Sequence, residues 1–329
     1  MFEGKDIEMG AVLGCALPGG SFKLPGIASL IDGAKQEGAL VEGDVVVEAS
    51  SGRALRTIIN LLRGYTSNTV GVMKQDVPTA KRGSVTFAGA NVVTPDIGLT
   101  PVETARRIGG GGWVDNGWKK NGNILNLDQY GSPYLKLGYR DWGAAQIVEE
   151  FGDFDVLVVA IGTGGTLLGL AEGLENLLGH KVVVVGVLCA DRQEIPGMRD
   201  RAGMRDIKHP WEAGCDHVVT MNRQTAFLCA PWLDWGIGAN SGPSGGAAYA
   251  AACQFAYRLI DENRLDEVRV RKDKTGPVKM LFVIHDSADL YVGDRLSEFS
   301  LDNFHPSTAR TPYQLIFCPD GNSLASAQL

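Results

Sequence analysis

Short apolar runs alternate with stretches of helical periodicity along most of this chain, and this alternation restricts the fold more than any other feature. Apolar runs without polar interruptions are typical of strands buried on both faces, and strands that alternate with helices indicate βαβ units around a parallel sheet. The expected strands are residues 44–48, 69–73, 91–93, 155–161, 182–187 and 278–284. The expected helices are residues 26–37, 53–63, 100–108, 142–151, 167–178, 246–263 and 290–299. We therefore expect an α/β protein, with an irregular linker or lid at 109–123 and an irregular tail at 305–329.

Composition and charge argue against several classes of partner. The net charge is −7 and the 31 lysines and arginines form no long cluster, so no nucleic-acid partner is expected. No apolar run is long enough to span a bilayer, and the first residues lack the basic start of a signal peptide, so we expect a cytoplasmic protein without membrane contact. The six cysteines are scattered, without C-x-x-C or a His/Cys cluster at metal spacing, which predicts free thiols and no metal site.

A glycine turn after one expected strand has the pattern of a phosphate site. Residues 155–161 lead directly into Gly162, Thr163, Gly164, Gly165 and Thr166, and then into an expected helix. The first N–H groups of a helix lack internal acceptors and carry partial positive charge, so this turn can hold an anion. Residue 167 is leucine where a dinucleotide motif needs its third glycine, and no G-K-[ST] follows. We expect a phosphate without a nucleotide; the alternative is a plain strand-to-helix turn without a ligand.

A lysine near the N-terminus is the second candidate for chemistry. Lys23 ends the segment 18–23 (PGGSFK) and directly precedes an expected helix. The positive end of the helix dipole repels an ammonium group, which depresses the pKa of the amine and favours an imine with an aldehyde. The alternative is an ordinary surface lysine.

Together with four further segments, these residues resemble fold-type II pyridoxal 5′-phosphate (PLP) enzymes, as a divergent member of the cysteine synthase and cystathionine β-synthase family. One of the four, residues 236–248, resembles the family's G-I-x-x-G-x-S-S-G-A-A segment. Residues 18–23 resemble the family segment whose lysine forms the Schiff base, and residues 162–166 resemble its G-T-G-G-T phosphate loop. The resemblance runs in order over roughly residues 19–299. It implies a two-lobed, tryptophan synthase β-like fold with twisted, mostly parallel sheets and PLP in the cleft between the lobes.

The resemblance also implies which residues face the substrate. Residues 48–52 (EASSG) are similar to the family's E-P-T-S-G loop, which grips the carboxylate of the amino acid, and residues 129–133 are similar to its Q-F-x-N-P segment. By this likeness, the substrate-binding residues are Ser50, Ser51, Gly52, Arg53 and Gln129.

The last of these segments concerns the cofactor ring. Residues 285–287 (HDS) resemble the family's P-D-S segment, and this implies that Ser287 contacts the pyridine nitrogen. A serine at that nitrogen leaves it unprotonated and makes the ring a weaker electron sink, which suits β-elimination rather than transamination. The implied reaction is β-replacement on an activated serine, of the O-acetylserine or O-phosphoserine type, through an aminoacrylate, with Lys23 as general base. A homodimer is implied as well.

Three departures from the family pattern leave the substrates open. Arg53 stands where the family has an asparagine that bonds the phenolic oxygen of the cofactor; the arginine can turn outward, bind an acidic group of a substrate, or mark lost activity. Residues 133–139 (PYLKLGY) replace the family's P-A-N-P-x-x-H stretch. The chain also reaches Lys23 early, whereas relatives usually carry a longer N-terminal segment.

Four other functions are considered. The chain can be a specialised enzyme that uses an amine or another thiol to make a non-standard amino acid, a serine or threonine dehydratase, or a non-catalytic family member that acts as a binding partner. A serine hydrolase is the fourth, because residues 242–246 (GPSGG) fit G-x-S-x-G, although the residues before them are poorly strand-like. For the main reading, we expect a smaller lobe of residues 17–132 and a larger lobe of residues 1–16 and 133–304.

Overall fold

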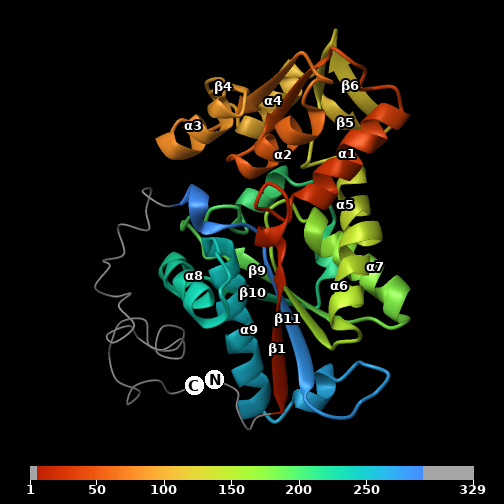
Figure 1. Ribbon diagram of the computed structural model, residues 1–329, viewed down its shortest axis with the longest axis vertical. Coiled ribbons are helices and arrows are strands. Elements are labelled where there is room, and N and C mark those ends of the chain that lie inside the picture. Colours follow the sequence, from red (N-terminus) through yellow and green to blue (C-terminus); the bar gives the residue numbers. More distant parts are fainter. Residues whose placement is uncertain (1–5, 292–329) are drawn as a thin grey trace.

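The computed structural model describes residues 6–291 of the chain. Two sheets organise these residues, one above the other along the long axis in Figure 1. Nearly all of the expected helix at 290–299, and the whole expected tail at 305–329, lie outside the described residues. Within the described part, no helix is both long and apolar enough to cross a membrane.

The larger sheet is parallel throughout, with the strand order β1-β11-β8-β9-β10. Its strands are β1 (Ile7–Leu13), β8 (Val156–Ala160), β9 (Val183–Cys189), β10 (His217–Met221) and β11 (Val278–Ile284). Successive side chains point to opposite faces, so Leu157 joins one hydrophobic cluster and Val158 the other. Burial on both faces explains the continuous apolar run in β8.

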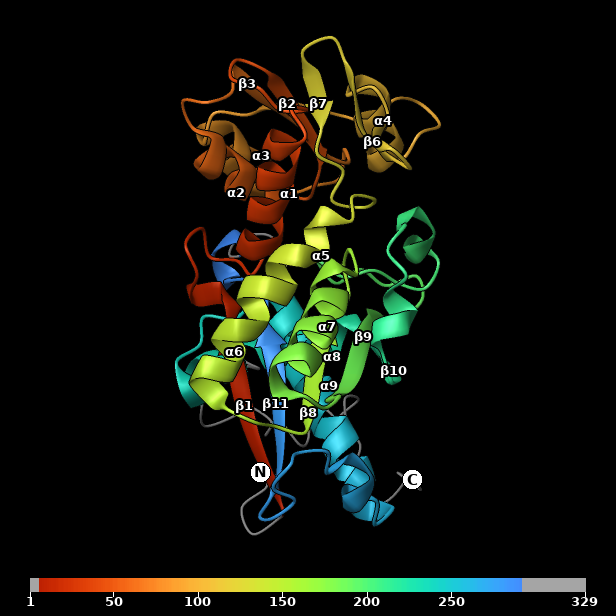
Figure 2. The ribbon, with the colours of Figure 1, turned by 90° about the vertical axis from the view of Figure 1, so that its right-hand side faces the viewer.

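Helices cover both faces of this sheet, as Figures 1 and 2 show. One face packs against α8 (Arg223–Ile237) and α9 (Pro243–Asp261), and the other against α5 (Tyr134–Gly138), α6 (Ala144–Phe151) and α7 (Gly165–Leu178), with a π-helical turn, η2 (Tyr139–Gly143), between α5 and α6. Short 3-10 turns complete this half of the molecule: η1 (Gly14–Ala16), η3 (Gly203–Asp206), η4 (Trp211–Gly214), η5 (Leu265–Val268) and η6 (Ala288–Leu290).

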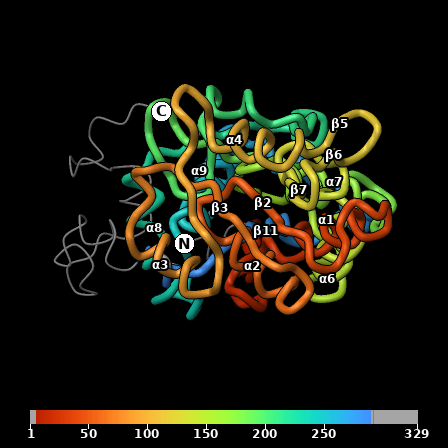
Figure 3. The backbone as a smooth tube through the Cα atoms, turned by 90° about the horizontal axis from the view of Figure 1, so that it is seen from above, coloured from red at the N-terminus to blue at the C-terminus, as the bar shows by residue number. Residues whose placement is uncertain are grey.

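The smaller sheet has the order β4-β3-β2-β7-β6-β5, which can be followed in Figure 3 from β3 to β5. Its strands are β2 (Val45–Ala49), β3 (Asn68–Val72), β4 (Asn91–Val93), β5 (Gly112–Val114), β6 (Gly117–Asn121) and β7 (Ile124–Asn126). Its helices are α1 (Leu24–Gln36), α2 (Arg53–Leu62), α3 (Thr79–Phe87) and α4 (Pro101–Ile108). The neighbouring strands β4, β3, β2 and β7 pair in parallel, whereas β6 pairs antiparallel with β7 and β5 pairs antiparallel with β6.

The linker or lid expected at 109–123 is wrong, because this stretch forms the β5–β6 hairpin. The rings of Trp113 and Trp118 pack edge-to-face across it, with centroids 4.9 Å apart. The strands have only three and five residues, and β6 ends in exposed polar residues, so the sequence shows too little alternation to indicate a strand.

The other expected elements within the described residues are present. All six expected strands and six expected helices lie within three residues of their predicted ends. Besides the hairpin, the sequence reasoning missed six elements of the described chain: β1, β7, β10, α3, α5 and α8. Two of these strands, β1 and β10, lie at the edges of the larger sheet, and α8 contains Pro231 inside the helix. Tertiary packing outweighs local propensity in these places.

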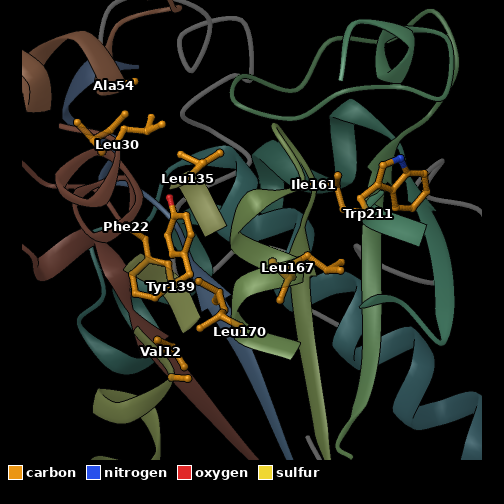
Figure 4. Close-up of a cluster of buried hydrophobic side chains, with 14 of the residues drawn as sticks. Val12, Phe22, Leu30, Ala54, Leu135, Tyr139, Ile161, Leu167, Leu170 and Trp211 are labelled. Atoms are coloured by element: carbon orange, nitrogen blue, oxygen red, sulfur yellow. The ribbon is translucent and has the colours of Figure 1, made fainter. Parts of the chain in front are cut away.

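A single hydrophobic cluster joins the two halves. It includes Leu30 of α1, Leu135 of α5 and Tyr139, which Figure 4 shows close to Phe22. The rings of Phe22 and Tyr139 have centroids 5.7 Å apart. Because Phe22 is buried in this core, the position of Lys23, the next residue, is set by packing between the halves.

Candidate active site

A cavity of about 510 Å³ opens at the carboxyl ends of β8, β9 and β11, where ligands bind in open parallel sheets. Nine of the predicted site residues line it: Lys23, Ser50, Ser51, Arg53, Gln129, Gly162, Thr163, Gly164 and Thr166. Three others, Gly52, Gly165 and Ser287, are not part of its lining. Residues from both ends of the chain and from both sheets therefore meet in one cavity.

Backbone hydrogen bonds hold Lys23 beside the end of β11. Phe22 N donates to His285 O at 2.7 Å, and Ser287 N donates to Gly20 O at 3.1 Å. Lys23 is the N-cap of α1, and its side chain lines the cavity. Burial lowers the pKa of Lys23 to about 8, and the charge of Asp286 opposes this shift. A larger fraction of this amine is therefore in the neutral, nucleophilic form near physiological pH than for an ordinary lysine, although the ammonium form still predominates.

The glycine turn forms an anion cradle at the start of α7. Gly164 is the N-cap in the left-handed conformation, with φ 80°, which only glycine adopts without strain. The first helical hydrogen bond runs from Leu168 N to Gly164 O, so the amides of residues 165–167 lie ahead of it. The Thr163 hydroxyl is buried and has no hydrogen-bond partner among the described residues. An orphaned donor beside free helix amides fits a phosphate group.

The loop after β2 is tied to Gln129. The Gln129 side-chain nitrogen donates to Ala49 O at 2.8 Å, and the Gln129 backbone nitrogen donates to Glu48 Oε2 at 3.3 Å. Burial raises the pKa of Glu48 to about 8, and the nearby charge of Asp128 adds to the shift. Gly52 N donates to Ser50 Oγ at 3.1 Å, so the loop is held in a fixed turn at the cavity.

Arg53 turns inward and contacts the end of β11. Its Nη2 donates to Ser287 O at 2.7 Å and to Ser287 Oγ at 2.6 Å, and its Nη1 donates to Gly19 O at 3.3 Å. The Ser287 hydroxyl donates its proton to Asp289 Oδ2 at 2.8 Å. The outward orientation considered for Arg53 from the sequence is therefore absent from the structure.

Sequence reasoning missed two cavity residues beside Lys23. Both ring nitrogens of His285 are buried without a hydrogen-bond partner among the described residues. Burial lowers the pKa of His285 to about 3, and the positive charge of Lys23 adds to this shift. Asp286 is also buried at the cavity, and burial raises the pKa of its carboxyl. The resemblance of residues 285–287 to the family's P-D-S segment had led to a prediction for Ser287 and to none for these two neighbours.

The sequence analysis also missed a loop that lines the cavity, although the order of the elements indicates it. The loop after β9, including Gln193 and Arg199, follows the carboxyl end of a strand next to β8. The rule that ligands bind at the carboxyl ends of parallel strands points to such loops. Arg199 N donates to Ile161 O at 3.0 Å, and its guanidinium lies 5.0 Å from the centre of the Tyr130 ring.

The structure gives no support to a hydrolase at Ser244. This residue lies in the first turn of α9, and α8 with a short loop precedes it, so the strand of a nucleophile elbow is replaced by a helix. The Ser244 hydroxyl donates to Asp286 Oδ1 at 3.3 Å and not to a histidine.

Comparisons with known proteins agree with this geometry. The family model described as pyridoxal-phosphate dependent enzyme matches residues 13–268. Rat cystathionine beta-synthase is 29% identical over 266 residues, which cover 75% of this chain and 46% of the rat protein. Cysteine synthase B of Escherichia coli (strain K12) is 26% identical over 245 residues, or 73% of this chain and 77% of that protein. The chain therefore spans a little under half the length of the cystathionine beta-synthases that it matches.

A solved structure shows the same fold. The crystal structure of O-ureido-L-serine synthase superimposes with a TM-score of 0.73 at 20% sequence identity, covering 90% of this chain and 89% of the other.

Proposed function

Because the chain belongs to the pyridoxal-phosphate dependent enzyme family, we propose that it uses PLP to replace the β-substituent of an activated serine, as cysteine synthase does. The observation that carries the proposal is one cavity that brings the Lys23 amine together with the Gly162–Thr166 cradle. Relatives and structural neighbours named for serine-derived products support the reaction class.

Each part of the cavity has a distinct task in this proposal. Residues 162–166 would hold the phosphate of the cofactor, and Lys23 would hold its aldehyde group, with loss of water, and move the α-proton of the substrate. Residues 50–52 and Gln129 hold the substrate carboxylate. When bound, the cofactor supplies the electron sink that makes loss of the β-substituent feasible. The core around Phe22 and Tyr139 keeps the lysine in place.

A titration of the purified, PLP-loaded protein tests the reaction. O-acetylserine, O-phosphoserine and serine are added separately while the visible spectrum is recorded. We expect one donor to produce a new band at longer wavelength, and sulfide, an organic thiol or an amine to discharge it with release of the matching amino acid. A dehydratase would instead release ammonia without a second substrate, and a non-catalytic member would leave the spectrum unchanged.

Lys23→Ala tests the role of the lysine. We expect the variant to lose the covalent link to PLP and to lose turnover by about 10²–10⁴-fold, the usual contribution of a positioned acid–base group. Reduction with borohydride followed by mass spectrometry locates the link. Lys35→Ala, at the far end of α1, is the matched control and should keep both. Unchanged turnover in Lys23→Ala would contradict the proposal.

Three expectations from the sequence complete the proposal. They are a homodimer, a cytoplasmic location, and a smaller lobe of residues 17–132 beside a larger lobe of residues 1–16 and 133–304. Light scattering on the purified protein measures the oligomeric state, fractionation of cells determines the location, and limited proteolysis locates the boundaries between the lobes.

A further inference from the structure

One loop of the larger half contacts both the phosphate turn and the segment around Gln129. It spans residues 190–216, between β9 and β10, and includes the short turns η3 and η4. On one side it packs against the glycine turn, because a Cβ on Gly164 would lie 3.0 Å from the Cβ of Trp211 and 3.7 Å from the Cβ of His209. This side of the loop is therefore held by close packing against the backbone of the cradle.

On its other side, the loop holds the backbone of residues 129 and 130. Lys208 N donates to Tyr130 O at 2.9 Å. His209 Nε2 lies 3.1 Å from Gln129 O, and because a carbonyl oxygen can only accept, this ring nitrogen carries the proton and donates. His209 is only 6% exposed, so this hydrogen bond is shielded from bulk solvent. Two consecutive carbonyl groups are thus held by two consecutive residues of the loop.

Gln129 lies between contacts from both halves of the molecule. Its backbone N–H donates to Glu48 of the smaller half, and its carbonyl accepts from His209 of the larger half. The preceding residue, Asp128, has φ 52°, a left-handed conformation that is strained for a residue with a side chain. A strained conformation persists only where the surrounding contacts enforce it. The hydrogen bond from His209 is one of these contacts, and it acts on the peptide group directly after Gln129.

We propose that His209 is a positioning residue that acts through Gln129: it fixes the peptide group after Gln129 and so directs the Gln129 side chain toward the carboxylate of the amino-acid substrate. The histidine is not part of the cavity lining, so it acts through its neighbour and not by contact with a ligand. Because it also packs against Gly164, the phosphate turn and the substrate segment share one support. The inference rests on the proposed function, which assigns Gln129 to the substrate.

Binding of L-serine to the PLP-loaded protein, measured by calorimetry, tests this role. His209→Phe keeps a ring and the Cβ beside Gly164 but removes the donor, and we expect the dissociation constant of L-serine to rise about fivefold or more, because a buried carbonyl loses its partner. His209→Gln can present an N–H to the same carbonyl and should stay within about threefold of the wild type. His180→Phe is the matched control, because it removes a ring hydrogen bond to Asp153 outside the cavity, and it should leave the affinity unchanged.

A double-mutant cycle shows whether His209 acts through Gln129. Gln129→Ala should itself weaken L-serine binding, and His209→Phe in that background should change the affinity by less than about twofold, because the side chain to be directed is gone. An effect of His209→Phe that is equally large with and without the Gln129 side chain would overturn the proposal. An unchanged affinity in Gln129→Ala would overturn it as well.

The affinity for PLP separates positioning from general support of the cavity. A fluorescence titration should give the same PLP dissociation constant for His209→Phe and the wild type, because the Cβ that packs against Gly164 is kept. A loss of PLP affinity in parallel with that for L-serine would overturn the specific role. If the wild type binds PLP and L-serine but replaces no β-substituent, the proposed function falls while the cycle still decides the role of His209. A PLP-loaded wild type that binds no L-serine would overturn both.

Discussion

Lys23 and His285 are two half-buried bases that line the same cavity. Neither ring nitrogen of His285 has a partner among the described residues, and burying a polar group without a hydrogen bond costs about 1–3 kcal/mol. Such a cost persists where a bound ligand supplies the missing partners. Burial also lowers the pKa of Lys23, so the same environment that destabilises the site prepares its amine for reaction.

The lowered pKa of Lys23 predicts how PLP uptake depends on pH. Only the neutral amine attacks an aldehyde, so the rate of uptake by the cofactor-free protein should rise with pH and level off above about 8. An unperturbed lysine would keep gaining up to about 10.4. Stopped-flow absorbance between pH 6.5 and 10 measures the profile. A midpoint near that of free lysine would show that burial does not lower this pKa.

At the level of elements, the N-terminus of α7 can form the phosphate cradle because Gly164 adopts the left-handed backbone conformation, which is strained for residues with a side chain. Gly164 has φ 80°, and a Cβ there would lie 3.0 Å from the Cβ of Trp211. Gly179, the C-cap of the same helix, has φ 73°, but a Cβ there would meet only the flexible end of Lys272. The two ends thus share backbone strain and differ in their neighbours.

These two glycines give a matched pair of substitutions. Gly164→Ala and Gly179→Ala should each cost about 1–2 kcal/mol in the free energy of unfolding, since both force alanine into the left-handed region. Only Gly164→Ala should weaken PLP binding, by tenfold or more, because it displaces the amides that face the phosphate. Urea unfolding and a fluorescence titration with PLP measure the two effects. Equal PLP affinity in both variants would contradict the assignment of the phosphate site to residues 162–166.

The whole molecule depends on close packing of α1 against the start of the larger half. A Cβ on Gly26 would lie 2.4 Å from Cε2 of Tyr139, so the helix can approach only because this residue is glycine. Tyr139 is fully buried, and burial raises its pKa to about 12. This contact sets the spacing between the halves and, through Phe22, the position of Lys23.

Gly26→Ala should therefore destabilise the protein by about 1–3 kcal/mol, the usual cost of overpacking a core. Gly83→Ala is the control, because Gly83 lies within α3 and a Cβ there meets nothing within 4 Å. Removing a helical glycine at such a site should be neutral or stabilise by up to about 1 kcal/mol. Chemical unfolding compares the two. A neutral Gly26→Ala would mean that α1 and Tyr139 adjust freely to each other.

The sequence by itself determined the α/β class, most element positions, and the two local motifs at Lys23 and 162–166. Strand and helix patterns and glycine turns act over a few residues, so they can be identified without knowledge of distant contacts. The β5–β6 hairpin was not predicted, because short, polar strands are stabilised by neighbouring strands and show no hydrophobic alternation of their own.

Only the tertiary structure decided what surrounds these motifs. Arg53 and Ser287 are 234 residues apart in the chain, yet they share a hydrogen bond of 2.6 Å. His285 and Asp286 line the cavity while Ser287 does not, although the three are consecutive. The direction of a side chain depends on the backbone path and on contacts made after folding, and here Arg53 and Asp289 hold the Ser287 hydroxyl.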